Sequence, residues 1–210
     1  EHLKNAKDVI PVYIDLEKIS LNPENFSIEF IGNIIFHFLR KPLNEYKKFL
    51  LLENLLKFEN ELKSKSAFSL VKTVENELLK IKPDQKLLVE TAFKFGEALG
   101  KDTNKKFLIA LDNFENLLDL NNFSQIKDVL SIINFESSFV NYITTSSSIR
   151  QLLHLLKKLE CYEIKNLEKK EAFGLIESII GKNDKVAQEI FDLSNGHPLV
   201  TILISKRYKE

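Results

Sequence analysis

The sequence predicts an α/β protein with a mostly parallel sheet, followed by a small all-helical subdomain. Three short apolar runs rich in β-branched residues are separated by segments whose apolar residues recur at helical spacing. Three more helical segments then follow one another with no strand between them. Six glycines and five prolines in 210 residues are too few for a turn-rich all-β fold. We therefore expect an α/β core over residues 1–166 and a helical subdomain over 167–210.

The first half of the chain opens with a strand and continues with helices. Val9–Leu16 (VIPVYIDL) predicts a buried strand bounded by polar residues. Asn22 and Pro23 then begin a helix that runs to about Arg40, with an apolar stripe at steps of four. Three more helices are predicted over 43–63, 66–81 and 84–99, the last ended by Gly100.

The second half returns to strands before the terminal helices. Lys106–Leu111 (KFLIAL) is too short and too continuous for an amphipathic helix, which predicts a strand buried on both faces. Phe139–Thr145 (FVNYITT) predicts another strand. The remaining predictions are helices over 123–134 and 148–158, a short strand over 161–164, and helices over 168–180, 185–193 and 198–208.

Composition excludes several functional classes. Lys+Arg and Asp+Glu both number 30, and neither half of the chain is polarised, so no basic stripe indicates nucleic acid. Cys161 is the single cysteine, which excludes an intramolecular disulfide or a cysteine zinc finger. No apolar run approaches the roughly 20 residues that span a bilayer, and the N-terminus lacks the apolar core of a signal peptide. We expect a cytoplasmic protein without membrane contact.

The first candidate site lies in FLIALDNFE, residues 107–115. This apolar strand ends in Asp112, followed by Asn113 and then Glu115. Ligands bind beyond the carboxyl ends of strands in open parallel sheets, and a carboxylate there can hold Mg²⁺ through water. Alternatively, Asp112 or Asn113 only caps the following helix, and the motif alone does not decide between these interpretations.

A second candidate is FVNYITTSSSIR, residues 139–150. Its strand leads into a cluster of hydroxyls that includes Thr145 and Ser146, and then into Arg150. Hydroxyls in this position can hydrogen-bond a phosphate or an attacking water, and arginine can stabilise transferred charge. The alternative is a serine-rich helix cap with an ordinary surface arginine.

A third motif, NGHPL, spans residues 195–199 between two predicted helices. Gly196 fits the left-handed residue after a helix, and Pro198 fits the first turn of the next one. Taken alone, this turn needs no functional explanation.

In their order along the chain, these motifs resemble the STAND branch of the AAA+-like P-loop ATPases, close to the archaeal ATPase family and to NB-ARC-type switches. FLIALDNFENLL is similar to their Walker B segment, YITTSS to the sensor-1 strand and LSNGHPLV to the Gly-x-Pro-Leu turn. VIPVYIDL is similar to the second strand, and YEIKNLEKKEAFGLI to the fifth strand leading into the lid. The resemblance implies a parallel sheet of the P-loop NTPase (ASCE) type with inserted helices, followed by a helical lid.

The resemblance also implies cofactors and residue roles. ATP or ADP would bind with Mg²⁺, which Asp112 would help to hold. Thr145 or Ser146 would be the sensor-1 hydroxyl, and Gly196 and Pro198 would border the base.

The resemblance also implies three positions with a part in catalysis. Asn113 occupies the place of the usual catalytic glutamate, and an amide cannot act as a general base. Glu115 is the candidate substitute. Arg150 would be the arginine that follows the sensor-1 strand, although it lies several residues later than usual.

The phosphate-binding motif G-x-x-x-x-G-K-[ST] occurs nowhere in the 210 residues. In the resembling family it precedes the second strand, and this sequence, which contains no methionine, starts inside the helix that follows. We therefore expect a fragment, inactive alone, of a Mg²⁺-dependent ATPase or nucleotide-controlled switch. A protein partner or self-association would act through regions outside this chain.

Two alternatives from other functional classes stay open. Asn113 and the missing phosphate-binding motif favour a non-catalytic protein-interaction scaffold on a degenerate NTPase fold. An AAA+ DNA-associated ATPase would carry its DNA-binding domain outside this chain, because no helix-turn-helix or basic extension occurs here.

Overall fold

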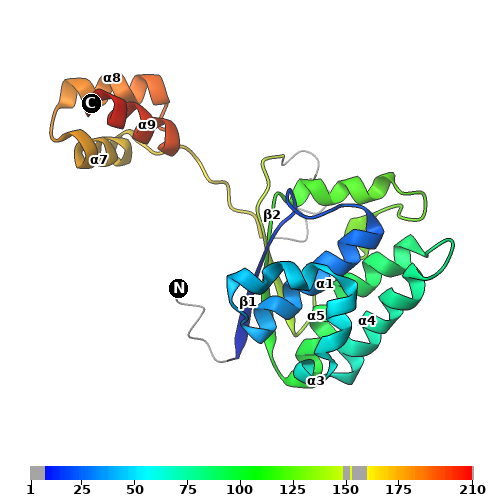
Figure 1. The fold of residues 1–210 in the computed structure, drawn as a ribbon. Helices are drawn as coiled ribbons and strands as arrows, with labels where there is room; N and C mark the ends of the chain where they lie inside the picture. The colour runs from blue at the N-terminus through cyan, green and yellow to red at the C-terminus, as the bar shows by residue number, and fades with distance from the viewer. Residues whose placement is uncertain (1–7, 149–151, 153–159, 210) are drawn as a thin grey trace. The chain divides into compact units, whose positions relative to one another are not determined.

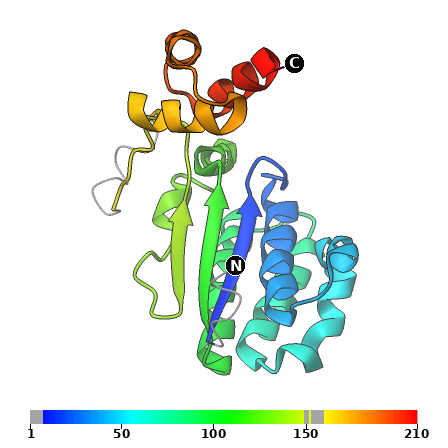
Figure 2. The same ribbon diagram turned by 90° about the vertical axis from the view of Figure 1, so that its left-hand side faces the viewer.

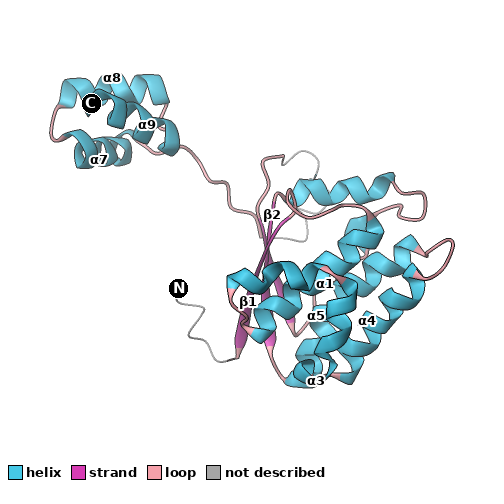
Figure 3. Ribbon diagram, in the orientation of Figure 1, coloured by secondary structure: helices cyan, strands magenta, loops and turns pink. Residues whose placement is uncertain are grey.

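The chain consists of two compact units, Glu1–Lys157 and Lys158–Glu210. A computed structural model describes residues 8–148, 152 and 160–209. The first unit contains a parallel sheet with its helices, and the second contains the three terminal helices (Figure 1, Figure 3). The prediction of an α/β protein with a parallel sheet is therefore confirmed. In the described residues, no helix is both long enough and apolar enough to cross a membrane.

Within the described ranges, the sheet has three strands in the order β1 (Val9–Asp15), β2 (Lys106–Asp112) and β3 (Val140–Thr144), as Figure 2 shows. Both pairs of neighbours are parallel, and Asp15 lies opposite Asp112 in the register of β1 and β2. The carboxyl ends of the strands therefore meet at one edge, as the three apolar runs predicted.

Helices pack on one face of this sheet. α1 (Pro23–Leu39) contacts β1, and α5 (Gln85–Thr103) contacts α1, β2 and β3. The first turn of α1 is capped by the Asn22 side chain, which accepts hydrogen bonds from two main-chain N–H groups. Between the two helices, the buried rings of Phe26, Phe30 and Phe93 have centroids 4.9–5.7 Å apart.

The opposite face of the sheet is only partly covered by the described residues. Tyr13 and Ile143, which share a register row with Ala110, are 52% and 53% exposed. Along β2, fully buried residues alternate with half-buried ones. The prediction that this strand is buried on both faces is therefore wrong, because the helices α1 and α5 cover one face alone.

The two outer edges of the sheet differ in their main-chain groups. Hydrogen bonds from Lys106 N–H to the Asp8 carbonyl and from Leu16 N–H to the Asp112 carbonyl show that even-numbered residues of β1 face β2. Pro11 therefore faces outward, where its missing N–H breaks no ladder bond. In β3 the outward N–H groups include those of Tyr142 and Thr144, and no described residue pairs with them.

The helix predicted over 43–63 is broken into short turns. The structure has η2 (Leu43–Leu50), α2 (Leu52–Leu55), η3 (Leu56–Phe58) and α3 (Glu59–Leu62). Phe49 and Leu55 are both buried, although six residues would place them about 120° apart around one continuous helix. The extended backbone of Leu51 separates the two turns, so that both side chains reach the core.

The neighbouring helices follow the prediction more closely. α4 (Lys65–Leu78) begins one residue before and ends three residues before its expected bounds. α5 continues past Gly100 to Thr103, and the following Asn104 takes the left-handed conformation. Gly100 lies inside the helix, and its lack of a side chain has a steric reason. An added Cβ would lie 2.7 Å from the Lys105 carbonyl oxygen and 2.9 Å from Phe139 Cβ.

The helix predicted over 123–134 does not form. Helical turns occur instead at η4 (Phe114–Asn122) and η5 (Val129–Ser131). The Asn121 side chain accepts from Val129 N–H, and the Asp128 side chain accepts from Leu130 N–H. These side chains satisfy main-chain donors locally and so compete with a continuous helix.

Residues 160–168 lack the short strand predicted over 161–164. Tyr162 and Ile164 are exposed, so this stretch has no buried face for a sheet to cover. The helix predicted over 148–158 falls almost entirely on residues outside the described ranges.

The second unit contains the three predicted terminal helices, α7 (Lys169–Ile180), α8 (Asp184–Ser194) and α9 (Pro198–Lys209). Glu168 and Glu171 form a reciprocal capping box at the start of α7. The small core contains Ile176, Val186 and Ile190.

Candidate functional site at the carboxyl edge of the sheet

The carboxyl ends of the three strands bring Asp15, Asp112 and Thr145 together. The loops after β2 and β3 are tied by two main-chain hydrogen bonds, from Thr145 N–H to the Leu111 carbonyl and from Phe114 N–H to the Thr145 carbonyl. The Thr145 hydroxyl donates to Asp112 Oδ1, and the Tyr13 hydroxyl donates to Oδ2 over 2.8 Å. A carboxylate and a hydroxyl from neighbouring strand ends are therefore in contact.

These two hydroxyls hold Asp112 in its ionised form. The hydrogen bonds from Thr145 and then from Tyr13 lower the pKa of the Asp112 carboxyl. A carboxylate offers about four acceptor positions, and the Asn113 main-chain N–H also donates to Asp112, so part of this capacity remains. Asp112 thus fits the role of a Mg²⁺ ligand, whether direct or through water.

Asp15 lies opposite Asp112 and is itself held by several contacts. Its carboxylate accepts from the Asn113 side-chain amide over 3.0 Å and from Glu17 N–H over 3.1 Å, and it pairs with the Lys18 ammonium at 2.7 Å. The Lys18 hydrogen bond is the main reason that the pKa of Asp15 is lowered. Asp15 therefore positions its neighbours in this structure and contributes one negative charge beside Asp112.

Asn113 adopts the left-handed conformation, with a φ of 55°. Asparagine tolerates this conformation better than most residues. Its amide nitrogen is directed at Asp15, which links the loop after β2 to the end of β1. Asn113 therefore positions the loop after β2, a role that needs only an amide hydrogen bond and no proton transfer.

Glu115 binds the serine loop that follows β3. Its Oε1 accepts from the Ser147 hydroxyl over 2.6 Å and from Ser147 N–H over 3.1 Å. Burial acts to raise the pKa of Glu115, but hydrogen bonds from Ser146 and Ser147 outweigh it, and the pKa is lowered. Glu115 Oε2 is buried without a hydrogen-bond partner among the described residues.

These contacts separate the two predicted sensor-1 hydroxyls. Thr145 contacts Asp112, whereas Ser146 contributes to the Glu115 cluster. The site therefore contains two neighbouring carboxylate centres, one at Asp112 and one at Glu115. Arg150, predicted beside them, lies outside the described residues.

Gly196 and Pro198 belong to the second unit, where their geometry has a local explanation. Gly196 has a φ of 73°, and an added Cβ would lie 2.3 Å from the Leu167 carbonyl oxygen. Its own carbonyl accepts from Leu167 N–H over 2.8 Å, and Pro198 is the first residue of α9. The NGHPL turn thus fastens the segment before α7 to the start of α9.

Sequence reasoning missed Tyr13 and Asp15 as members of the site. Asp15 lies one residue before the end of the strand predicted over Val9–Leu16, so its position near a parallel sheet edge was the available signal. Tyr13 carried no signal, because only the register places its hydroxyl beside Asp112.

Comparisons with family models, with curated proteins and with solved structures returned no match for this chain. The site therefore has to be interpreted from its own geometry. The described residues contain no group of three or more His, Cys, Asp or Glu side chains arranged to hold a metal ion. A Mg²⁺ ion at Asp112 would accordingly need waters or ligand oxygens for most of its coordination.

Proposed function

We propose that this chain is a nucleotide-binding module that takes ATP or ADP with Mg²⁺ at the carboxyl edge of its sheet. The observation that carries the proposal is the contact between Asp112, at the end of β2, and Thr145, directly after β3. Ordered acceptors and hydroxyl donors at such an edge suit a hydrated Mg²⁺ ion and phosphate oxygens. The resemblance of the ordered motifs to STAND and AAA+-type P-loop ATPases supports the same class.

Each described residue of the site has a defined part in this proposal. Asp112 holds the Mg²⁺ ion, most simply through water, and Thr145 orients the carboxylate and can turn its hydroxyl toward a phosphate. Asn113 and Asp15 fix the loop after β2. Glu115, ionised by its serine contacts, is the carboxylate available to orient a water. Residues that cradle the phosphates would come from a segment other than these 210 residues, because the glycine-rich lysine motif is absent from them.

The test is a calorimetric titration of ATP, with and without Mg²⁺, into the native protein with all the sequence that its gene encodes. We expect Mg²⁺-dependent binding that Asp112→Asn weakens about tenfold or more, which corresponds to about 1.4 kcal/mol or more. Asp119→Asn is the matched control, because Asp119 is an exposed carboxylate on the adjacent η4. Unchanged affinity in Asp112→Asn would remove Asp112 from the site.

A non-catalytic scaffold is the second candidate, and two observations favour it. Asn113 stands where an ATPase would carry a general base, and the uncovered sheet face exposes Tyr13 and Ile143. Exposed apolar residues that share a face mark surfaces for protein contact. A folded native protein that binds no ATP in the presence of Mg²⁺ would favour this candidate over the first.

A further inference from the structure

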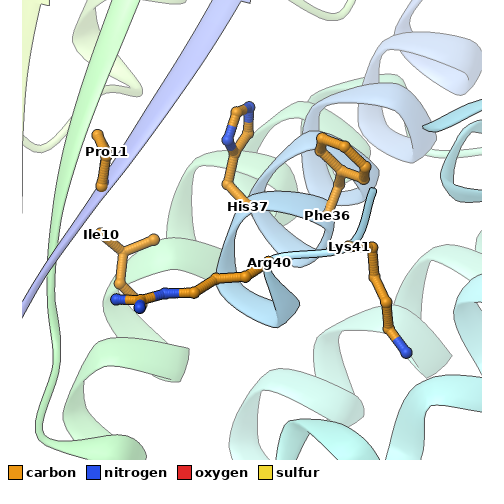
Figure 4. Close-up of a pocket in the computed structure, with 6 residues that line it drawn as sticks. All are labelled: Ile10, Pro11, Phe36, His37, Arg40 and Lys41. Carbon is orange, nitrogen blue, oxygen red and sulfur yellow. The ribbon is translucent and has the colours of Figure 1, made fainter. Parts of the chain in front are cut away.

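A second concave site lies between α1 and the amino-terminal half of β1. This cavity, of about 340 Å³, is shown in Figure 4 and is lined by Ile10, Pro11, Phe36, His37, Arg40 and Lys41. None of the six lining residues belongs to the carboxyl-edge site. The volume of the cavity falls in the range of small-molecule pockets.

The floor of the cavity is apolar and well packed. Ile10 and Phe36 are buried residues of the main core, and Phe36 makes edge-on contacts with the rings of Tyr46 and Phe49. Pro11 contributes a ring and no N–H group at the outer edge of the sheet. An apolar ligand body seated here would contact a surface that the fold already holds in place.

The charge of the lining is positive. Lys41 is paired with Glu61 at 2.8 Å, whereas the Arg40 side chain has no ion pair or hydrogen bond with any described residue. Burial lowers the pKa of His37, so its imidazole is neutral at pH 7. No carboxylate is among the six lining residues. Among the described residues, the guanidinium of Arg40 is thus the charged group of the cavity lining that has no ionic partner.

Arg40 is also unusual in its type and in its conformation. Three of the 30 basic residues are arginines, and this one lines the cavity. It occupies the left-handed position after α1, with a φ of 50°, and its side chain extends toward Ile10 on β1 while Lys41 points away (Figure 4). A planar guanidinium can donate two parallel hydrogen bonds to one carboxylate or phosphate, which an ammonium cannot.

We propose that this cavity binds a small organic anion, with its carboxylate or phosphate on Arg40 and its apolar body on Ile10, Pro11 and Phe36. The site is independent of the nucleotide site at the carboxyl edge. The two oxyanions share the chemistry that Arg40 recognises, and the ligand titrations below distinguish them.

The test is a set of NMR titrations of the 210-residue chain with benzoate, phenyl phosphate and inorganic phosphate. We expect benzoate or phenyl phosphate to shift the signals of His37 and Arg40, and the tighter of the two identifies the preferred oxyanion. Inorganic phosphate should bind more weakly, because it has no apolar body. Absence of binding by both aromatic anions up to about 10 mM, where binding would be weaker than about 3 kcal/mol, would overturn the proposal.

Two variants test the assignment to Arg40. Arg40→Gln should weaken binding of the preferred anion about tenfold or more, and Arg40→Lys should weaken it by less, because the charge remains without the paired donors. Lys63→Gln is the matched control. Lys63 is a cationic residue that follows α3 with a left-handed backbone conformation, at a φ of 51°, and it does not line the cavity. Equal losses in Arg40→Gln and Lys63→Gln, or no loss in either, would refute the role of Arg40. Unchanged spectra outside the cavity show that each variant is folded.

Discussion

Replacing Gly32 by alanine tests how closely η2 approaches α1. An added Cβ at Gly32 would lie 1.9 Å from the Phe49 carbonyl oxygen. Non-bonded heavy atoms settle at about 3.5 Å, so η2 would have to retreat by roughly 1.5 Å. Phe49 is fully buried, and its ring stacks on Phe58 with a centroid distance of 4.6 Å. The retreat therefore disturbs a packed aromatic contact.

The expected loss of stability follows from two opposing effects. Overpacking costs about 1–3 kcal/mol, and we expect the upper end because the obstacle is main chain. Alanine regains about 1 kcal/mol of helix propensity relative to glycine. The net loss for Gly32→Ala is then about 2 kcal/mol in the free energy of unfolding of the first unit.

Urea unfolding followed by tyrosine fluorescence measures this loss, and Gly96→Ala is the control. Gly96 lies inside α5 in the same unit, but an added Cβ would meet the side-chain methyl groups of Val140 at 3.3 Å and Ile34 at 3.6 Å. We expect a change of less than about 1 kcal/mol for the control. A Gly32→Ala variant as stable as the wild type, or an equal loss of stability in Gly96→Ala, would contradict this steric clash.

Three further predictions follow from particular contacts. The Asp102 carboxylate accepts from the Ser66 and Ser64 hydroxyls over 2.7 and 2.8 Å, which lowers its pKa and ties α5 to the start of α4. This stabilisation is fully present above the unfolded pKa of about 3.9 and is lost as the pH falls through the lower folded pKa. Asp102→Asn should therefore be less stable than the wild type at pH 7 in urea unfolding, with the gap closing in acid; a gap of the same size at about pH 2 would contradict this. Thr145→Val should raise the pKa of Asp112 in carbon-13 NMR titrations, because it removes the main hydrogen bond that lowers it; an unchanged pKa would show that this bond is not made in solution. Gly196→Ala should destabilise the second unit by about 1–3 kcal/mol in calorimetric melting, because of its positive φ and the nearby Leu167 carbonyl. Gly174→Ala, with no atom within 4 Å of the added Cβ, should stabilise that unit by up to about 1 kcal/mol, and similar effects of the two changes would refute the steric argument.

The sheet could be predicted from the sequence because its signals are local. The runs at Val9–Asp15, Lys106–Asp112 and Val140–Thr144 are short and apolar, and helical segments of suitable length separate them. The rule that parallel strands end at the same edge places the residues after β2 and β3 near one another, and the structure adds which hydroxyl, that of Thr145, contacts Asp112.

The unpredicted features depend on tertiary contacts. Phe49 and Leu55 would lie about 120° apart on a continuous helix, and both reach the core because the extended backbone of Leu51 breaks it. Helical periodicity carries no information about that break. Tyr13 and Asp15 join the site through a register with β2, almost 100 residues away in sequence. No local pattern encodes such a register.

The two edge strands of the sheet, β1 and β3, differ in the main-chain groups that they offer to a further strand. On the β1 side, Pro11 interrupts the row of main-chain donors, and the His37 imidazole makes a further hydrogen bond to the main chain of Tyr13. On the β3 side, Tyr142 and Thr144 present intact amides to their surroundings, and no described residue pairs with them. An incoming polypeptide that extended this sheet would complete its ladder at β3 and would meet a gap at β1. The β3 edge is therefore the edge at which a further strand can pair without a missing hydrogen bond.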